Sequence, residues 1–195
     1  MDFLIATHNK KKQAEMQRVL EPLGINVKTA EDLGIELSEV EENGTTFYEN
    51  ARIKALSGCK ESGLPCIADD SGICVDFLDG GPGIYSARYS GGDDEDNNDK
   101  LLKELDGVET EKRTAHYACS ISCCFPDGRE LKAEGKCYGY IGFERQGTGG
   151  FGYDPLFITE KGCFGELSPA EKDEISHRGI ALRELKEKLE SENLQ

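Results

Sequence analysis

Two adjacent carboxylates, Asp69 and Asp70, are the first residues of the chain whose types and position suggest chemistry. They follow the predicted strand LPCIA and precede Ser71. Two like charges at the end of a buried strand lower stability unless something binds there. Because successive side chains of a strand point to opposite faces, both carboxylates cannot serve one ligand while the strand continues. We therefore predict a binding site in which the two carboxylates have different roles.

Three consecutive lysines, Lys10, Lys11 and Lys12, begin the helix predicted after the strand DFLIA and the turn THN. A helix N-terminus presents unpaired N–H groups and a partial positive charge, so it attracts anions and is an unfavourable place for lysines. The cluster is therefore typical of an anion site. A solvated group of lysines is the alternative, and this segment alone does not decide between them.

An acidic loop precedes the second predicted helix, which opens with a capping box of Thr46 and Glu49 and carries Asn50 and Lys54 on one face. Such loops are usually solvated surface. Combined with Asp70, however, a loop carboxylate would complete an oxygen-rich site for Mg²⁺, which takes one or two carboxylates together with phosphate oxygens and water. The acidic residues of this loop are Glu39, Glu41 and Glu42.

Two further stretches carry residues suited to binding. The stretch GTGGFGYDPLF interleaves glycines with aromatic residues, so a ligand can approach its backbone and Phe151 can offer a flat face to a base. A tight turn between strands is the alternative. Near the C-terminus, His177 and Arg178 immediately precede the predicted last helix. A lone histidine is more often structural than catalytic.

The elements that must position these residues form an α/β pattern with an antiparallel portion. It is not a regular series of β-α-β units. The turn PDG predicts a hairpin, and the acidic run GGDDEDNNDK predicts a solvated loop that leads into a helix. We expect strands over residues 2–6, 64–68, 116–125 and 130–143, and helices over residues 10–24, 45–58, 101–108 and 175–190.

Composition limits the class of protein. The chain has 195 residues, 37% of them hydrophobic, which predicts a single domain over residues 1–195. Its formal net charge of −15 argues against nucleic acid and anionic membranes as partners. The sequence shows no apolar run of membrane-spanning length and no export signal, so we expect a cytoplasmic protein. Its eight cysteines lie mostly in apolar strings and predict buried, reduced thiols.

In this order and at this spacing, the motifs resemble the inosine triphosphatase family, nucleoside-triphosphate pyrophosphatases that remove noncanonical purines such as dITP, ITP and XTP. The resemblance implies a homodimer of mixed α/β subunits, each an elongated mixed sheet with flanking helices and two lobes around a central nucleotide cleft. It also implies Mg²⁺-dependent release of a nucleoside monophosphate and pyrophosphate. The motifs are ATHNKKK, EENGTTFYENARIKA, ADDSGICVD, GPGIYSARY, GTGGFGYDPLF and SHRGIAL, which together span nearly the whole chain.

The resemblance also implies a role for each matched residue. Asp70 is the general base and, with Glu41, a metal ligand. From the alternation of side chains along a strand, we expect Asp69 to support Asp70 without contacting the ligand. Bacterial members often have glycine where this chain has Lys11, so the role of Lys11 stays open. The phosphate-binding residues are Thr7, Asn9, Lys12 and Lys54, and Ser71 is a contact residue. The further candidate substrate-binding residues of the same motif are His8, Lys10 and Lys11. The base-binding residues are Phe151, Gly152, Tyr153, Asp154, Lys172, His177 and Arg178.

Base selection is expected from Arg178, because its guanidinium is a permanent donor that attracts the 6-oxygen of inosine and xanthosine and opposes the 6-amino group of adenosine. The preferred noncanonical base and the preferred sugar are not decided by the sequence. Two alternatives remain open. One is another Mg²⁺-dependent phosphate-ester hydrolase, such as a sugar phosphatase, and the other is a non-catalytic nucleotide-binding protein.

Overall fold

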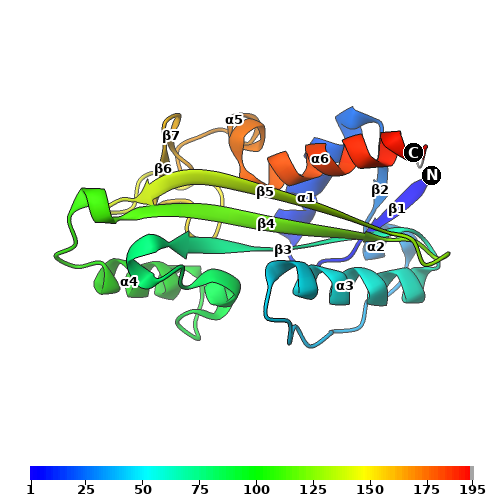
Figure 1. Ribbon diagram of the computed structural model, residues 1–195, viewed down its shortest axis with the longest axis horizontal. Coiled ribbons are helices and arrows are strands. Elements are labelled where there is room, and N and C mark those ends of the chain that lie inside the picture. The colour runs from blue at the N-terminus through cyan, green and yellow to red at the C-terminus, as the bar shows by residue number, and fades with distance from the viewer. Residues whose placement is uncertain (194–195) are drawn as a thin grey trace. The chain divides into compact units, whose positions relative to one another are not determined.

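Residues 1–193, the part of the chain that the computed structural model describes, contain seven strands in one mixed sheet (Figure 1). The strand order is β2-β1-β3-β4-β5-β6-β7. Strand β1 pairs in parallel with β2 and β3, whereas β6 pairs antiparallel with β5 and β7. The predicted α/β class with an antiparallel portion is confirmed. The strands are β1 (Asp2–Ile5), β2 (Asn26–Lys28), β3 (Cys66–Val75), β4 (Thr114–Cys124), β5 (Glu130–Ile141), β6 (Phe157–Thr159) and β7 (Gly162–Cys163).

The helices begin at side-chain caps that can be identified in the sequence. Helix α3 opens with the predicted capping box of Thr46 and Glu49, and α4 opens with a capping box of Asp93 and Asp96. None of the helices formed by the described residues combines the length and apolar sequence needed to cross a bilayer. The α-helices are α1 (Lys10–Leu20), α2 (Ala30–Leu33), α3 (Phe47–Ser62), α4 (Asp94–Glu104), α5 (Pro169–Ile175) and α6 (His177–Ser191).

Three boundary predictions are wrong. Helix α3 does not stop near Gly58 but continues to Ser62, where Gly63 ends it with a positive φ of 69°. Gly58 is needed for packing, because a Cβ there would lie 2.6 Å from the Cys66 sulfur. The acidic run is not a loop before a helix, since it forms the first turns of α4. The last helix begins at His177, so His177 and Arg178 do not precede it, although the predicted range of residues 175–190 already included them.

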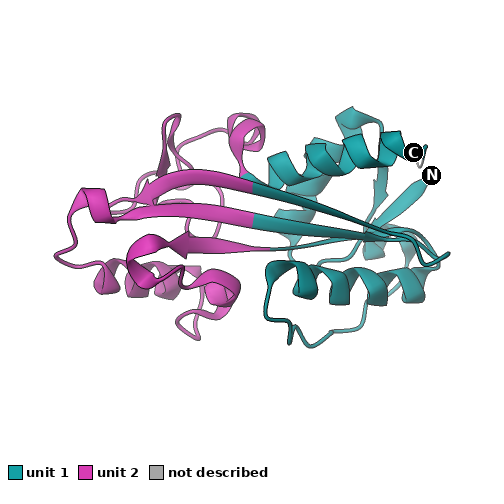
Figure 2. Ribbon diagram, in the orientation of Figure 1, with its two compact units in different colours: residues 1–70, 119–135, 177–195 teal, residues 71–118, 136–176 magenta. Residues whose placement is uncertain are grey.

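The chain divides into two compact units (Figure 2). Unit 1 comprises residues 1–70, 119–135 and 177–195, and unit 2 comprises residues 71–118 and 136–176. Strands β3, β4 and β5 contribute residues to both units, so neither unit is a continuous segment. The prediction of a single domain stays a prediction.

Unit 1 has a core on each face of its strands, and the alternation of side chains separates the two. Phe3, Ile5 and Ile67 pack with apolar residues of α1 and α6, while Leu4 and Ala68 pack with residues of α3 on the other face. Each fully buried side chain of this size contributes about 1.5–3 kcal/mol of transfer free energy. This alternation fixes the direction in which every side chain of β3 points.

Unit 2 is organised around buried aromatic rings. Tyr117 lies edge-on to Phe157, with ring centroids 4.9 Å apart, and stacks on Phe164 at 5.9 Å. The Arg113 side chain is buried and donates to three backbone carbonyl oxygens, those of Leu105, Ile141 and Gly142. These contacts give unit 2 a core independent of unit 1.

All eight cysteines lie within the described residues, and each is a buried thiol that forms no disulfide. This confirms the prediction of buried, reduced thiols. Burial raises the pKa of Cys66 and Cys123, among others, because it disfavours the charged thiolate. The cysteines therefore serve as small apolar core residues.

Candidate active site

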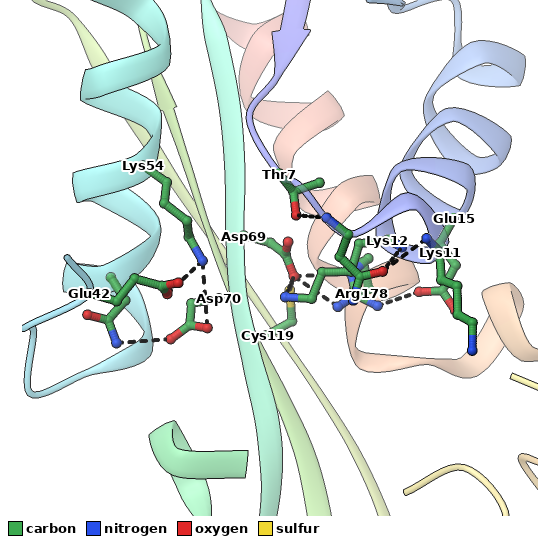
Figure 3. A network of polar contacts seen from close by, with 12 residues as sticks. Thr7, Lys11, Lys12, Glu15, Glu42, Lys54, Asp69, Asp70, Cys119 and Arg178 are labelled. Atoms are coloured by element: carbon green, nitrogen blue, oxygen red, sulfur yellow. Dashed lines mark hydrogen bonds and ion pairs between the residues drawn. The ribbon is translucent and has the colours of Figure 1, made fainter. Parts of the chain in front are cut away.

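Strand β3 places Asp69 and Asp70 on opposite sides of the sheet (Figure 3). The alternation that directs Ile67 toward α1 and α6 directs Asp69 the same way, and Asp70 follows Ala68 toward α3. The strand continues to Val75, so the carboxylates cannot turn to the same face. The predicted strand of residues 64–68 is therefore too short, and the alternation expected within a continuing strand separates the two carboxylates. Their different roles stay a prediction.

Asp70 lies against the first half of α3. The Asn50 side-chain amide donates to Asp70 Oδ2 at 3.1 Å, and Lys54 Nζ lies 3.9 Å from Asp70 Oδ1. Because Asn50 and Lys54 are four residues apart, the helix presents both on one face. Lys54 also donates to Glu42 at 2.8 Å, which brings a carboxylate of the acidic loop to the same ammonium group.

The pKa of Asp70 is raised from its ordinary value. Burial is the largest cause, and the charges of Lys54 and Lys12 and the hydrogen bond from Asn50 offset it only in part. Burial lowers the pKa of Lys54, but Asp69, Asp70 and Glu42 outweigh it and raise that pKa overall. The site therefore holds a firmly charged lysine beside a carboxylate that protonates more readily than usual.

Asp69 has a different environment. It is 1% exposed, and its Oδ2 accepts from Lys12 Nζ at 3.1 Å and from Arg178 Nη2 at 2.9 Å and Nε at 3.2 Å. Burial alone would raise its pKa, but Lys12, Arg178 and Lys54 together hold that pKa well below its usual range. Asp69 is thus a fixed negative charge that holds two cations. The support of Asp70 by Asp69 stays a prediction.

Glu15 was missed by the sequence analysis. It lies on α1, is 7% exposed, and its Oε2 accepts a short hydrogen bond from Arg178 Nη1. Burial would lower the pKa of Arg178, but Asp69 and Glu15 raise it. The only available signal was the spacing of Glu15 one helical turn after Lys12, on the side that also carries the buried Met16.

Residues 7–9 form the turn that caps α1, and Lys10, Lys11 and Lys12 are the first residues of the helix. The Asn9 side chain accepts from the backbone N–H groups of Lys11 and Lys12, at 3.0 and 3.2 Å, and Thr7 Oγ1 accepts from the N–H of Asn9. Asn9 is therefore the N-cap of α1. The Lys12 side chain points inward to Asp69, whereas the side chains of His8, Lys10 and Lys11 are exposed.

In unit 2, the turn Phe151–Asp154 is brought together with Lys172. Asp154 is 2% exposed, and its Oδ2 accepts from Lys172 Nζ at 2.6 Å and from the N–H of Phe151 at 2.9 Å. Lys172 Nζ also lies 4.9 Å from the centre of the Phe151 ring, within the range of a cation–π contact. Five of the predicted base-binding positions, the four of the turn and Lys172, thus lie together in this unit.

The other predicted site residues are less closely joined to these clusters. Ser71 follows Asp70 on β3 and is half-buried, and His177 is buried at the start of α6. The side chain of Glu41 is exposed, and it is its neighbour Glu42 that contacts Lys54. Among residues 1–193, no three or more histidine, cysteine or acidic side chains are grouped as a ready-made metal site.

The mixed sheet defines an α/β protein, and in unit 1 the lysines around two buried carboxylates form a candidate site for a phosphorylated ligand. Comparison with known proteins gives a more specific result. The chain belongs to the Ham1 family, whose sequence profile matches residues 3–188. The family relationship predicted from the motifs is therefore confirmed.

Relatives and solved structures agree over nearly the full length. The chain is 50% identical to the dITP/XTP pyrophosphatase of Haemophilus influenzae, covering 96% of this chain and 98% of that protein. It is 48% identical to the dITP/XTP pyrophosphatase of Bacillus licheniformis, covering 94% and 95%. The structure of a HAM1 protein from Coxiella burnetii matches with a TM-score of 0.86 and 36% identity, covering 98% of this chain and 99% of that one.

Proposed function

We propose that the protein hydrolyses noncanonical purine nucleoside triphosphates, namely dITP, ITP and XTP, to the nucleoside monophosphate and pyrophosphate, and so removes them from the nucleotide pool. The observation that carries this proposal is the setting of Asp70. It is a carboxylate with a raised pKa, held by Asn50 beside Lys54 and Glu42. The names of the relatives, dITP/XTP pyrophosphatases at 48–50% identity, support the choice of substrate.

Asp70 is assigned as the general base. It accepts the proton of a water molecule whose oxygen attacks the α phosphorus, and the bond from that phosphorus to the bridging oxygen of pyrophosphate breaks. A base works best when its pKa approaches the working pH, so a pKa raised by burial suits this role. The hydrogen bond from Asn50 holds the carboxylate in position.

The donor set near Asp70 fits Mg²⁺. Asp70 and the acidic loop supply hard carboxylate oxygens, and the small number of grouped acidic residues leaves positions for phosphate oxygens and water, as Mg²⁺ prefers. We assign Asp70 and Glu41 as ligands, as the sequence predicts, and add Glu42 as a candidate because it is the loop carboxylate closest to Lys54. When bound, Mg²⁺ supplies charge neutralisation for the phosphates.

Lys12 and Lys54 are assigned to the phosphates. The charges of both lysines act on Asp69 and on Asp70, so the two ammonium groups influence one region. Positive charge there stabilises the negative charge that develops on the leaving pyrophosphate. Thr7 and Asn9 shape the turn that caps α1, the helix that carries Lys12, and Ser71 follows Asp70 on β3.

The purine base is assigned to the turn Phe151–Asp154 with Lys172, His177 and Arg178. The Phe151 ring offers a stacking face, and Asp154 with Lys172 offers a fixed acceptor and donor beside it. Arg178 is the proposed donor to the 6-oxygen. Its Nε and Nη2 donate to Asp69 and its Nη1 donates to Glu15. Because Nε carries a single N–H, this role falls to the second N–H of Nη1 or Nη2.

Predictions about partners and location complete the proposal. We expect a homodimer in the cytoplasm, with no nucleic-acid partner because of the net charge of −15.

A substrate panel tests the function. The purified protein with Mg²⁺ is offered ITP, sugar phosphates and p-nitrophenyl phosphate, and both orthophosphate and pyrophosphate are measured. We expect pyrophosphate from ITP alone. Orthophosphate from the monoesters would favour the alternative phosphatase, and ITP binding without any product would favour a non-catalytic binding protein.

A further inference from the structure

The acidic helix α4 contacts the backbone of the turn Phe151–Asp154. Asp94 Oδ2 accepts from the N–H of Gly152 at 2.9 Å, and Asn98 Nδ2 donates to the carbonyl oxygen of Gly152 at 2.9 Å. Asp94 and Asn98 are four residues apart and therefore share one helix face. Between them they bind both polar groups of a single residue in the turn.

Gly152 has a backbone conformation that needs such support. Its φ is +60°, in the left-handed region that glycine adopts readily and other residues do not. A glycine at the tip of a turn has many accessible conformations, so the peptide needs external contacts to hold one of them. The pair of hydrogen bonds from α4 provides these contacts.

The neighbouring peptides of the turn are held in the same way. The Tyr117 hydroxyl accepts from the N–H of Tyr153 at 3.1 Å and donates to Asp154 Oδ1 at 3.3 Å. The N–H of Phe151 is bound by Asp154. Each N–H from residue 151 to residue 153 therefore donates to a side chain, and only that of Gly152 depends on α4.

Asn98 is an unusual residue to bury for packing alone. It is 0% exposed, and its Oδ1 has no hydrogen-bond partner among residues 1–193. A buried amide with an unpaired oxygen lowers stability, which a residue retained only for stability would not do. The hydrogen bond that its Nδ2 donates to the carbonyl oxygen of Gly152 holds the turn.

We infer that Asp94 and Asn98 are positioning residues that set base selectivity by fixing the Gly152 peptide, and with it the Phe151 ring. This inference rests on the proposed role of the turn in base binding. Neither residue contacts the base itself. The acidic run of α4 therefore acts in substrate selection, through the backbone of unit 2, and is not merely a solvated surface.

The test compares four variants by the ratio of kcat/KM for ITP to kcat/KM for ATP. This ratio does not depend on the fraction of enzyme that is folded, because both substrates meet the same sample. Asp94→Ala and Asn98→Ala remove the two bonds, and Asp94→Asn keeps an oxygen acceptor for the N–H. Asp96→Ala is the matched control, because it removes the capping box of α4 without touching Gly152.

We expect the ratio to fall about tenfold or more in both alanine variants, since small displacements of a binding group have large effects on rate. Asp94→Asn should retain most of the wild-type ratio, and Asp96→Ala should leave the ratio unchanged. Inhibition by tripolyphosphate, which has no base, should be the same in all four. If Asn98→Ala does not fold, the exposed Asp94 still provides the test.

An unchanged ratio in the Asp94→Ala variant would overturn the inference, and so would an equal fall in Asp96→Ala. Failure of the proposed function has a different signature. In that case the wild-type protein itself would release no pyrophosphate from ITP, or would not discriminate between ITP and ATP.

Discussion

Asp69 and Asp70 are adjacent in β3, yet their carboxylates lie on opposite faces and their pKa values are shifted in opposite directions. Burial acts on both. For Asp69, the cations Lys12 and Arg178 outweigh it, whereas for Asp70 the nearby Lys54 does not. Asp69 is therefore a firmly charged carboxylate, whereas Asp70 takes up a proton more readily than usual.

Replacing Asp69 by asparagine and replacing Asp70 by asparagine should have opposite effects on the stability of the metal-free protein. Asp69→Asn leaves Lys12 and Arg178 without their shared carboxylate and should lower the free energy of unfolding by about 3–5 kcal/mol at pH 7. Asp70→Asn removes a charge that burial disfavours, so it should raise the free energy of unfolding. Urea unfolding in the presence of a chelator measures both. A less stable Asp70→Asn protein at pH 7 would contradict the raised pKa.

The pH dependence gives a second check on the same pair. The pKa of Asp70 is raised on folding, so the advantage of Asp70→Asn over wild type should be full at pH 7 and shrink as pH falls through the raised value toward 3.8. The pKa of Asp69 is lowered on folding, so its stabilisation should persist down to about 3.8 and be lost only below it. Unfolding curves from pH 7 to pH 4 should separate the two.

Turnover should depend on Asp70. Asp70→Asn keeps the shape of the side chain but cannot accept the proton, and general-base loss costs about 10²- to 10⁴-fold in rate. Asp79→Asn, a change of the same type at an exposed position, is the control. Pyrophosphate release from ITP is measured for both. Activity of Asp70→Asn within tenfold of wild type would remove Asp70 from the mechanism.

Lys54 should contribute to phosphate binding without affecting base choice. Lys54→Ala should raise KM and lower kcat for every triphosphate, because the charge it removes faces the phosphates in all of them. Lys60→Ala, on an exposed position of the same helix, should change neither. Steady-state kinetics with ITP, GTP and ATP provide the comparison. An altered ranking of the three nucleotides would mean that Lys54 contacts the base.

Arg178 should discriminate between 6-oxo and 6-amino purines. Arg178→Ala should reduce the kcat/KM ratio of ITP to ATP by a factor on the order of 10²–10⁴, because a site built around one hydrogen-bonding group rejects analogues lacking it. It should also destabilise the fold, since Asp69 and Glu15 lose their partner. Glu15→Gln is the control for that second effect, and it should preserve the ratio. An equal loss on every nucleotide would assign Arg178 to structure alone.

Local signals in the sequence predicted much of the fold. The turn PDG indicated the hairpin of β4 and β5, and the capping box of Thr46 and Glu49 indicated the start of α3. The end of α3 was missed because Gly58 is dictated by contact with Cys66, which local sequence does not reveal. Helix α4 was missed in part because its acidic start resembles a loop, although acidic residues favour a helix N-terminus.

The site was less predictable where its contacts are remote in sequence. The spacing of Asn50 and Lys54 placed both on one helix face in advance. The contacts of Asp70 with them were not predicted, because the expected strand ended before Asp69. The partner of Glu15, however, is 163 positions away, and Arg178 meets Asp69 across 109 positions. No local pattern connects residues at such separations. The bonds from α4 to Gly152 are of the same kind.

The most direct measurement of the proposed activity is pyrophosphate release by the wild-type protein with Mg²⁺, using ITP, XTP, GTP and ATP at equal concentrations below KM. We predict one pyrophosphate for each nucleoside monophosphate formed, with ITP and XTP hydrolysed far faster than GTP and ATP. Release of orthophosphate in place of pyrophosphate, or equal rates on all four nucleotides, would contradict the proposed function.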